Sequence, residues 1–495
     1  MYNLEGGKSM SVISKEKYLE SLRKMKPNIY KFDELIKDVT THPATRGVVK
    51  THAHAFGMSE IPEKRELVVT TSHLTGEEVM RWTNLMWSKE ELAMNMKFKR
   101  QMFLEAGNCH AGECVGWQMF NIMWAVTADT DAKHGTKYQE RLKTYILKAQ
   151  ENGWVIAGAL TDAKGDRSFG ADAQPENQDA YVHIVEKRED GIVVTGCKAQ
   201  IAGVAAANEI FVGPTTGLKE SGKDYAVAFA IPRDMKGVTI VESRGVSDKR
   251  RFEEGWDVPD YGITQGWIFF DKVFIPNERV FMAGEFEAAG QFISGFTANY
   301  RACIGACVAG QGDCMIGTAV LGIRANGLPV SKFNDKIVEM SLNNENTYAM
   351  GLGAITLGTQ HSSGTIIADP KTAHANKVFV AKLPAETRRI CQEIIGGIAE
   401  TGCLPSYADF KSDQNGEMIQ KYFKAGKGAS AETRARAARL AEYFTVGGGI
   451  PGCMHGGGSP DGARMVVKSL TPLDKLAEYA KKIAGITEDV KDPIK

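Results

Sequence analysis

The spacing of apolar residues divides the chain into three segments. Up to about residue 150, apolar positions recur every three or four residues, which is the pattern of amphipathic helices. The clearest helices predicted there are Lys15–Met25, Leu67–Trp87, Leu92–Leu104 and Cys114–Asp129. Residues 1–150 are therefore expected to form an N-terminal helical domain.

The middle segment changes to short runs rich in Val, Ile, Tyr and Phe, separated by Gly, Pro and Asp, as strands are. The predicted strands are Tyr181–Glu186, Gly191–Thr195, Ala226–Ile231, Val238–Glu242 and Trp267–Pro276. Helical spacing returns after them and is interrupted by the glycine-rich Val446–Gly458. We expect an α+β fold, with a β domain at 151–285 and a C-terminal helical domain at 286–495.

The composition of the chain excludes some classes of binding partner. The 495 residues carry 60 Lys and Arg against 60 Asp and Glu, with no basic stripe, so a nucleic-acid partner is not expected. No apolar run approaches the roughly 20 residues of a membrane span. Met1–Lys17 lacks the apolar stretch of a secretory signal, and the nine cysteines are an odd number. A cytoplasmic protein with free or metal-bound thiols is expected.

Four of these cysteines form two close pairs, Cys109 with Cys114 and Cys303 with Cys307. Four thiolates are what an iron–sulfur cluster needs, and each pair would come from a different helical region. Cys303 lies one helical turn before Cys307, on the same helix face as Tyr300. The alternative is that they are buried apolar side chains, which is our interpretation of the other cysteines: Cys197, Cys314, Cys391, Cys403 and Cys453.

Two further segments have features of a ligand site. Ala159–Ser168 places Thr, Asp and Gly in a tight turn at the start of the β domain, where backbone N–H groups and hydroxyls suit a flavin edge or a phosphate. A plain surface turn is the alternative. Gly396 and Gly397 stand inside a helical pattern, where paired glycines cost stability, so a ligand or another backbone is expected to approach closely.

Together these segments resemble the acyl-CoA dehydrogenase architecture. More narrowly, the chain is similar from about Lys17 to Ile483 to the 4-hydroxybutyryl-CoA dehydratase family, which is related to the flavin-dependent 4-hydroxyphenylacetate 3-hydroxylases. The resemblance is carried by Thr161–Arg167, Ile184–Val194, Phe270–Val280 and Met454–Pro460. It implies a barrel-like middle β domain, FAD, a 4Fe–4S cluster, an acyl-CoA substrate and a homotetramer. The residues it implies for FAD are Leu160, Thr161, Asp162, Asp166, Arg167, Ser168, Gln200, Ile201, Ala202 and Gly203, together with Gly396 and Gly397.

The chain departs from that family at the cluster ligands. The family has three residues between its first two cysteines, and here four separate Cys109 from Cys114. Where the family has a histidine seven residues before its third cysteine, this chain has Tyr300, and Cys307 matches the cysteine. The resemblance leaves the fourth ligand open between Cys303, His110 and solvent on the Tyr300 side.

The acid–base residues also differ. Tyr300, Gln265 and Gly452 stand where the family has its histidine and two glutamates, and Gln and Gly cannot titrate. Groups that can replace them are His110, Glu113, Tyr300 and His455. His52 and His54 can face one side of a strand as ligands or form a solvated pair.

Three hypotheses follow. The first is a lyase of the dehydratase and isomerase kind, acting on a hydroxyacyl-CoA or related thioester by a flavin-radical mechanism with altered acid–base residues. The second is a monooxygenase of the 4-hydroxyphenylacetate 3-hydroxylase type. The third is a non-catalytic paralogue that keeps the fold. The first is favoured, because monooxygenase chemistry gives no reason for the four cysteines. The resemblance does not distinguish dehydration, isomerisation and another elimination.

Overall fold

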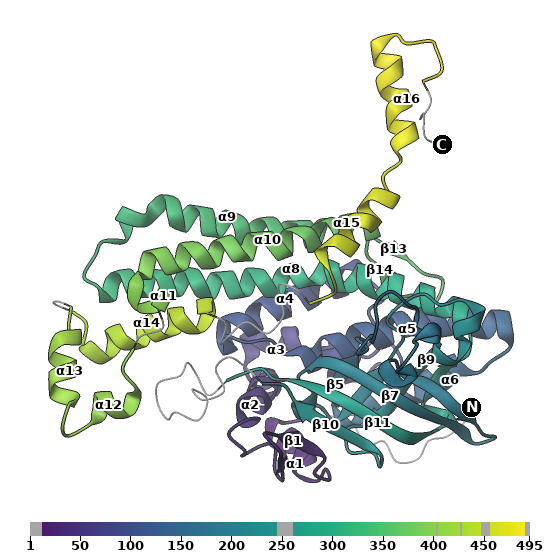
Figure 1. Cartoon of the computed structure of the whole chain (residues 1–495), viewed down its shortest axis with the longest axis horizontal. Helices are drawn as coiled ribbons and strands as arrows, with labels where there is room; N and C mark the ends of the chain where they lie inside the picture. The colour runs from purple at the N-terminus through teal and green to yellow at the C-terminus, as the bar shows by residue number, and fades with distance from the viewer. Residues whose placement is uncertain (1–11, 245–260, 402–403, 426–427, 447–455, 491–495) are drawn as a thin grey trace.

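The computed structural model describes residues 12–244, 261–401, 404–425, 428–446 and 456–490. Its elements follow the order predicted from the apolar spacing, with helices first, strands next and helices again (Figure 1). The exact domain boundaries stay a prediction.

The N-terminal helices enclose the first cysteine pair. They are α1 (Lys15–Arg23), α2 (Arg46–Gly57), α3 (Pro62–Val68), α4 (Lys89–Ala106), α5 (Val115–His134) and α6 (Tyr138–Asn152). A capping box at Ser88 begins α4, and Gly107, with a φ of 65°, ends it. The next helix, α5, is buried at every position from Gly116 to Thr127.

One predicted helix is wrong. Leu67–Trp87 contains the end of α3, the hairpin strands β3 (Val69–Thr71) and β4 (Glu78–Met80), and a short 3-10 turn. The β-branched run at β3 favours a strand, and Gly76 adopts a φ of 79° in the connection. The spacing of the apolar residues resembles that of a helix, but these residues lie on two strands that face the same core.

The β region consists of two sheets, and its described strands do not close into a barrel. One sheet has the strand order β2-β1-β10-β11-β7-β6, and the other has the order β12-β9-β8-β5. The bounds are β1 (Ile29–Lys31), β2 (Glu34–Ile36), β5 (Ile156–Ala159), β6 (His183–Lys187), β7 (Gly191–Ala202), β8 (Glu209–Val212), β9 (Val227–Pro232), β10 (Val238–Glu242), β11 (Gln265–Pro276) and β12 (Val280–Ala283). Because β1 pairs with β10, a piece of the N-terminal segment joins the larger sheet.

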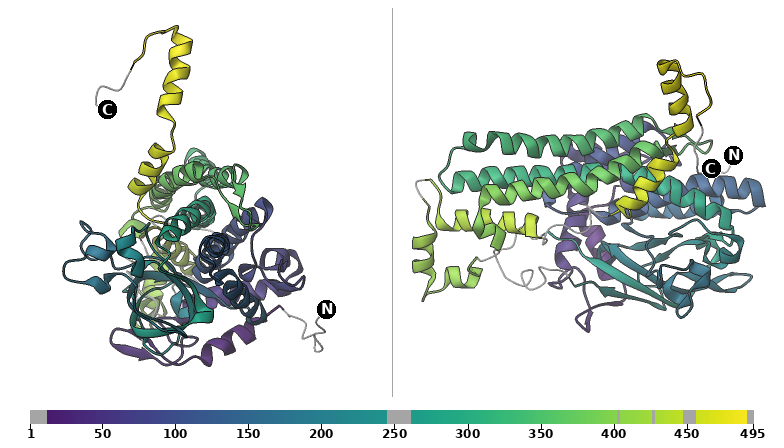
Figure 2. Two further views of the ribbon diagram at one scale, coloured as in Figure 1. Left: turned by 90° about the vertical axis from the view of Figure 1, so that its right-hand side faces the viewer. Right: turned by 45° about the horizontal axis from the view of Figure 1, so that its top comes forward.

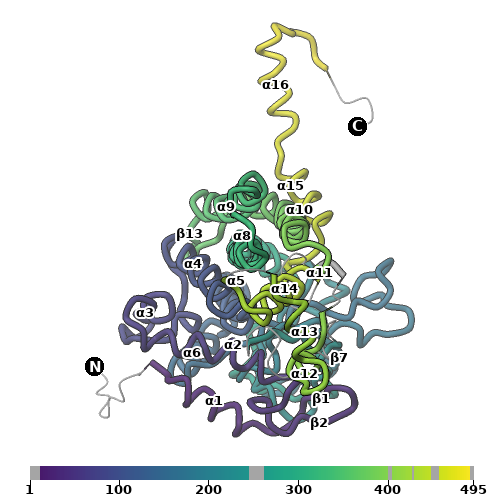
Figure 3. The backbone as a smooth tube through the Cα atoms, turned by 90° about the vertical axis from the view of Figure 1, so that its left-hand side faces the viewer, coloured from purple at the N-terminus to yellow at the C-terminus, as the bar shows by residue number. Residues whose placement is uncertain are grey.

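Three long helices form the C-terminal bundle and run side by side (Figures 1 and 2): α8 (Phe286–Ala325), α9 (Asn334–Thr356) and α10 (Pro370–Ile395). A short hairpin of β13 (Thr359–Gln360) and β14 (Ile366–Ile367) joins the last two. The remaining helices are α11 (Gly397–Thr401), α12 (Tyr407–Lys411), α13 (Gly416–Phe423), α14 (Ala431–Val446), α15 (Pro460–Ser469) and α16 (Leu473–Ala484). The last helix projects from the body and has no buried residue (Figure 3).

The core helix α8 connects the bundle with the N-terminal helices. It packs against α4, α5, α9 and α10. By length and composition it is the one described helix apolar enough to cross a membrane, but 67% of that window is buried inside the protein. We therefore interpret α8 as the central core helix. It carries the second cysteine pair into contact range of the first.

Candidate functional site

The four paired cysteines lie together although nearly two hundred residues separate the pairs. Cys109 and Cys114 flank the short 3-10 turn η3 (Ala111–Glu113), and Cys303 and Cys307 lie on the buried side of α8. Burial raises the pKa of the Cys307 thiol well above its usual value, Lys99 opposes the rise, and the other three cysteines add to it. Cys114 interacts in the same way with Cys109 and Cys303. The packing of α4, α5 and α8 thus gathers the whole quartet.

Tight backbone packing fixes the loop that carries the first pair. A side chain at Gly112 would meet Val155 at 2.3 Å, and one at Gly116 would meet the carbonyl oxygen of Ile156 at 2.1 Å. Only glycine permits these approaches, which press the loop against β5. The side chain of Asn108 is held by the Tyr443 hydroxyl, which donates a 2.8 Å hydrogen bond.

The ammonium of Lys99 lies among these sulfurs. The Lys99 side chain is wholly buried, and its Nζ lies 5.5 Å from the centre of the Tyr300 ring. Burial lowers the pKa of Lys99, but Cys114, Cys307 and Cys303 together raise it above its ordinary value. Three sulfurs of the quartet therefore act on one buried cation.

Several polar atoms around the quartet have no hydrogen-bond partner of normal geometry in the described part of the chain. They belong to Asn95, Lys99, His110, Glu113 and Gln118. Because native proteins pair almost all of their buried polar groups, such a set of unpaired atoms is what a bound group would satisfy. These residues lie on α4, in the loop and turn from His110 to Glu113, and on α5.

His110 and Glu113, two of the predicted acid–base residues, are both buried here. Burial lowers the pKa of His110 well below its usual value and raises that of Glu113 well above its usual value, which favours the uncharged form of each. His52 Nδ1 lies 2.8 Å from the Val48 carbonyl oxygen, and its Nε2 accepts a 3.1 Å hydrogen bond from the Gly112 amide. Glu113 Oε2 lies 3.5 Å from the same Nε2. These contacts assign the proton of a neutral His52 to Nδ1.

The sequence interpretation of His52 and His54 was wrong. Both lie on helix α2, not on a strand, and they point to different neighbours. His52 is wholly buried beside Glu113, whereas His54 lies 2.8 Å from Glu105. They form neither a solvated pair nor a shared ligand site.

Tyr300 lies between the quartet and the last glycine-rich segment. Its ring stacks on Phe296 and packs against Gly457, whose carbonyl oxygen accepts a 2.9 Å hydrogen bond from Arg301. His455, the remaining predicted acid–base residue, lies outside the described residues, as do Gly452, Cys403 and Cys453.

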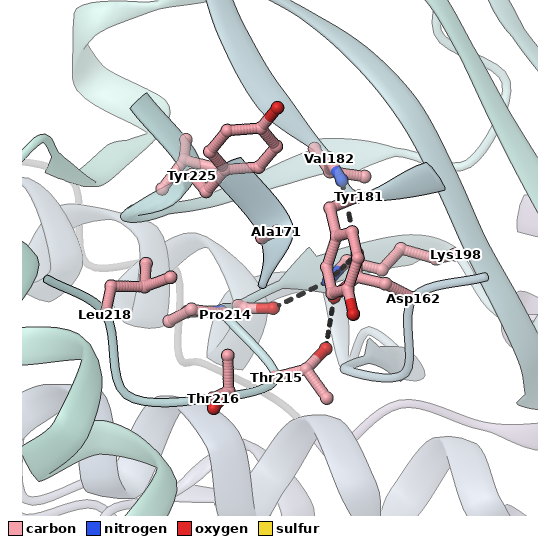
Figure 4. A pocket seen from close by; sticks show the side chains of 12 residues that line it. Asp162, Ala171, Tyr181, Val182, Lys198, Pro214, Thr215, Thr216, Leu218 and Tyr225 are labelled. Atoms are coloured by element: carbon pink, nitrogen blue, oxygen red, sulfur yellow. Dashed lines mark hydrogen bonds and ion pairs between the residues drawn. The ribbon is translucent and has the colours of Figure 1, made fainter. Parts of the chain in front are cut away.

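The turn predicted to hold a flavin borders a surface hollow of about 420 Å³. The hollow is lined by Lys164, Arg167, Phe169, Gly170, Ala171, Tyr181, Thr215 and Thr216. Below it is a pocket of about 10 Å³, enough for one water molecule, with Asp162 and Lys198 in its wall. Figure 4 shows Asp162 and Lys198 in this pocket together with the rings of Tyr181 and Tyr225.

Asp162 forms a buried ion pair there. Lys198 Nζ lies 2.7 Å from Asp162 Oδ1 and also donates to the carbonyl oxygens of Leu160 and Gly213. Thr161 is half-buried, whereas Asp166, Arg167 and Ser168 are exposed. Of these predicted flavin residues, Asp162 and Arg167 line the pocket and the hollow.

The second predicted flavin segment lies nearer to the cysteine loop. Gln200, at a φ of 60°, is exposed, Ile201 is buried, and Ala202 pairs with Gln265 in the sheet. A side chain at Gly203 would come within 3.0 Å of His52 Nε2. This segment therefore packs against His52, which in turn binds the cysteine loop at Gly112.

Gly396 and Gly397 lie apart from both. Gly396 follows the end of α10 and Gly397 begins α11, at the end of the bundle away from the strands (Figure 1). No described atom outside their own chain neighbours lies within 4 Å of a side chain built on either. Gly396 has a φ of 87° and is the C-cap residue that ends α10. Within one chain these glycines do not meet the Thr161 turn.

Sequence reasoning missed Lys99, Gln118 and Lys198. A signal existed for Lys99, since it occupies the apolar face of α4 between Met96 and Met102. No pattern along the chain joins Lys198 to Asp162. In the described part of the chain, no three His, Cys, Asp or Glu side chains stand close enough to share one metal ion.

Comparison with known proteins places this geometry in context. Family models described as 4-hydroxyphenylacetate 3-hydroxylase N terminal and C terminal match residues 14–282 and 289–485. The chain is 35% identical to the 4-hydroxybutyryl-CoA dehydratase/vinylacetyl-CoA-Delta-isomerase of Clostridium aminobutyricum, across 96% of this chain and 100% of that relative.

Solved structures give the same result. An oxygen-tolerant archaeal 4-hydroxybutyryl-CoA dehydratase from N. maritimus is 36% identical, with a TM-score of 0.93 over 98% of this chain and 97% of that one. The oxygenase component of 4-hydroxyphenylacetate 3-monooxygenase, solved with FAD, is 22% identical, with a TM-score of 0.77 over 96% and 100%. A glutaryl-coenzyme A dehydrogenase is 14% identical, with a TM-score of 0.51 over 96% and 97%. The last two show the fold alone, and together these likenesses confirm the predicted fold class.

Proposed function

This chain belongs to the 4-hydroxyphenylacetate 3-hydroxylase family and, within it, to the 4-hydroxybutyryl-CoA dehydratase/vinylacetyl-CoA isomerase enzymes, and from that membership we propose an FAD- and 4Fe–4S-dependent lyase acting on an acyl-CoA. The similarity to enzymes of the dehydratase and isomerase class over nearly the whole chain confirms the resemblance stated from the sequence. The cofactors, the radical mechanism, the thioester substrate, the homotetramer and the cytoplasmic location belong to the proposal.

The observation that carries the proposal is the convergence of Cys109, Cys114, Cys303 and Cys307 around Lys99. Four thiols are the donor set of a 4Fe–4S cluster. A cubane cluster attaches each thiolate to a different iron, so its ligands stand further apart than those of a single ion. No three His, Cys, Asp or Glu side chains of the described residues stand close enough to share one ion, which agrees with that arrangement, and these four cysteines would hold the cluster.

The residues around the turn suit FAD. Lys164 and Arg167 bring two cations to the hollow, which favours the phosphates of a dinucleotide. When bound, FAD supplies one-electron chemistry that no side chain offers. The proposed FAD residues remain those from Leu160 to Ser168 and from Gln200 to Gly203. Within one chain Gly396 and Gly397 lie away from the Thr161 turn. We therefore propose that they contact the flavin of a neighbouring copy in the homotetramer.

The chain's own residues would handle the proton. Burial raises the pKa of Glu113 and so favours its uncharged form, and both carboxyl oxygens lack a hydrogen-bond partner in the described structure. A carboxylic acid held in this way can deliver or receive a proton at Oε2 when substrate arrives. His52 accepts a hydrogen bond from the Gly112 amide and lies 3.5 Å from Glu113 Oε2, so it holds the loop that carries this carboxyl group. His110, Tyr300 and His455 remain proposed members of the acid–base set.

The altered acid–base set leads us to propose a substrate other than 4-hydroxybutyryl-CoA. Gln265, which stands where the family has a glutamate, pairs with Ala202 at the start of β11 and cannot titrate. Tyr300 replaces the family's histidine beside the quartet. Removal of the same hydrogen from the same carbon would need a base that these positions lack.

Anaerobic purification tests the proposal directly. Brown protein with about four irons and four sulfides per chain, together with one FAD, is the expected result. A panel of hydroxyacyl-CoA and enoyl-CoA thioesters, followed by mass spectrometry for loss of water or a shifted double bond, then identifies the reaction. Colourless protein, or yellow protein without iron, would rule the proposal out.

The monooxygenase alternative rests on the shared family models and on the fold of the FAD-bound oxygenase component. It expects oxygen-dependent hydroxylation of a phenol by reduced FAD, without iron. Replacing Cys303 and Cys307 with alanine together would then leave turnover unchanged. The convergence of the quartet favours the lyase.

A further inference from the structure

Cys303 is the one member of the quartet with no counterpart in the ligand set that the resemblance implies, and two polar side chains act on it. Gln118 Nε2, on α5, donates to Cys303 Sγ over 3.7 Å. Lys99, on α4, is among the charges that act on the same thiol. Both side chains are wholly buried, so neither is hydrated by solvent.

Lys99 needs an anionic neighbour. Moving an ammonium from water into an apolar interior is costly unless a negative charge or hydrogen bonds replace the water. Lys99 Nζ has no nitrogen or oxygen partner of normal geometry in the described structure, and its strongest electrostatic partners are Cys114, Cys307 and Cys303. The face of the Tyr300 ring, 5.5 Å away, contributes a weaker attraction. The negative charge that Lys99 needs must therefore come from the sulfurs.

A histidine-to-cysteine exchange among cluster ligands supplies that charge. Imidazole binds as a neutral ligand, whereas a thiolate adds one negative charge, so a cluster held by four cysteines is one unit more negative than one held by three cysteines and a histidine. Extra negative charge makes the addition of an electron harder. A buried cation and an N–H donor beside the sulfurs oppose that effect, because reduced iron–sulfur clusters are stabilised by positive charge and by hydrogen bonds to sulfur.

We propose that Lys99 is the countercharge of the four-cysteine cluster and that Gln118 is the hydrogen-bond donor to its added ligand, Cys303, so that the two residues together raise the cluster's reduction potential. They are positioning residues that act through the sulfurs. The inference rests on the proposed function, since it requires the cluster to be present.

The test is a redox titration of the purified holoenzyme, followed by the visible and electron paramagnetic resonance spectra, with iron and sulfide measured on every sample. Lys99→Met keeps the length and apolar stem of the side chain and removes the charge. We expect full iron, and an equilibrium constant for cluster reduction at least tenfold lower, which is about 59 mV for one electron. Gln118→Leu should shift the constant in the same direction by a smaller factor.

Two matched variants make the result specific. Lys97→Met removes the same charge two residues away on the exposed side of α4 and should leave the potential unchanged. Lys99→Arg keeps the charge and should keep most of the potential. A Lys99→Met protein that loses its iron while Lys99→Arg retains it also supports the role of the charge.

Each remaining outcome overturns the inference. Full iron in Lys99→Met with an unchanged potential would show that Lys99 does not act on the cluster. If both Lys99 variants lose iron, the Gln118→Leu titration decides, and an unchanged potential there would refute the shared role. Absence of iron from the wild-type protein would remove the proposed function itself, and iron analysis distinguishes that failure from the others.

Discussion

Lys198 Nζ lies 2.7 Å from Asp162 Oδ1, and neither side chain is more than 4% exposed. The pair joins β7 to the turn after β5, and the Thr215 hydroxyl donates a hydrogen bond to the other carboxylate oxygen of Asp162. A buried pair of this kind positions the backbone of the proposed flavin turn. It also makes the turn sensitive to the loss of either charge.

Replacement of Asp162 by asparagine tests that dependence. Asp162→Asn preserves the shape but leaves the Lys198 ammonium with only carbonyl partners. We expect the free energy of unfolding to fall by about 3 kcal/mol, measured by urea denaturation with the FAD content recorded on the same sample.

The matched control is Asp166→Asn, an exposed aspartate in the same turn whose Oδ1 accepts from the Ser168 amide. It should change stability by less than about 1 kcal/mol. The double variant Asp162→Asn with Lys198→Met should recover part of the loss, because no charge is left unpaired. Equal effects of the two asparagine variants would contradict this account.

Loss of Cys303 should remove cluster iron. Cys303 interacts electrostatically with Cys114 and Cys307, so it belongs to the same group of sulfurs. Cys303→Ala is expected to lower the iron content by at least one atom per chain from about four and to weaken the brown absorbance. Iron and sulfide analysis of anaerobically purified protein measures this. Cys197→Ala is the control, since Cys197 is a buried cysteine on β7 beside Asp162 and Lys198. Iron loss in both variants would point to general damage.

Close packing of α8 against α9 predicts an asymmetry between two glycines of one helix. A side chain at Gly305 would come within 2.1 Å of the Thr347 carbonyl oxygen, whereas one at Gly317 meets no atom within 4 Å. Gly305→Ala should therefore destabilise the protein by about 1–3 kcal/mol and disturb the face that carries Cys303 and Cys307. Gly317→Ala should be neutral or stabilising by up to about 1 kcal/mol. Thermal unfolding and iron content of both variants check the contrast.

The buried carboxyl group of Glu209 predicts a pH dependence of stability. Burial raises its pKa to about 7, although Arg279 lies 2.7 Å away and opposes the shift. Between its ordinary pKa, near 4.5, and about 7, the folded state holds a proton that the unfolded state has released. The free energy of unfolding therefore falls as pH rises through this window, by at most about 3 kcal/mol from this group.

Glu209→Gln removes that contribution. The stability of this variant minus that of the wild type should increase between pH 4.5 and 7.5, measured by urea denaturation at a series of pH values. Glu186→Gln is the control, because Arg188 lowers the pKa of exposed Glu186 and its effect lies below pH 4.5. A difference for Glu209→Gln that stays constant with pH would contradict the raised pKa.

Particular residues show where sequence reasoning succeeded. Helical spacing placed Cys303 and Cys307 on one face of a helix, and α8 has them there. The turn from Thr161 to Ser168 was recognised as a structured corner, and it borders a hollow. Both features depend on neighbours within a few residues, which periodicity and turn chemistry describe well.

The failures share a different cause. The run at Leu67–Trp87 has helix-like spacing, but its apolar residues belong to separate elements that meet one core. The two histidines of α2 were placed on a strand because their spacing alone does not specify the element. The sequence also offered no partner for Asp162, since Lys198 lies 36 positions away on a strand of the larger sheet.

The chain's sequence by itself determined the order of helical and strand segments, the supply of four cysteines in two pairs, and the absence of titratable groups at Gln265 and Gly452. These are properties of residue type and local spacing. Tertiary structure alone decided that the two pairs meet, that Lys99 lies among their sulfurs, and that Glu113 is buried beside His52. Contacts between α4, α5 and α8 arise from the packing of helices distant in the chain, and burial there sets which groups are charged.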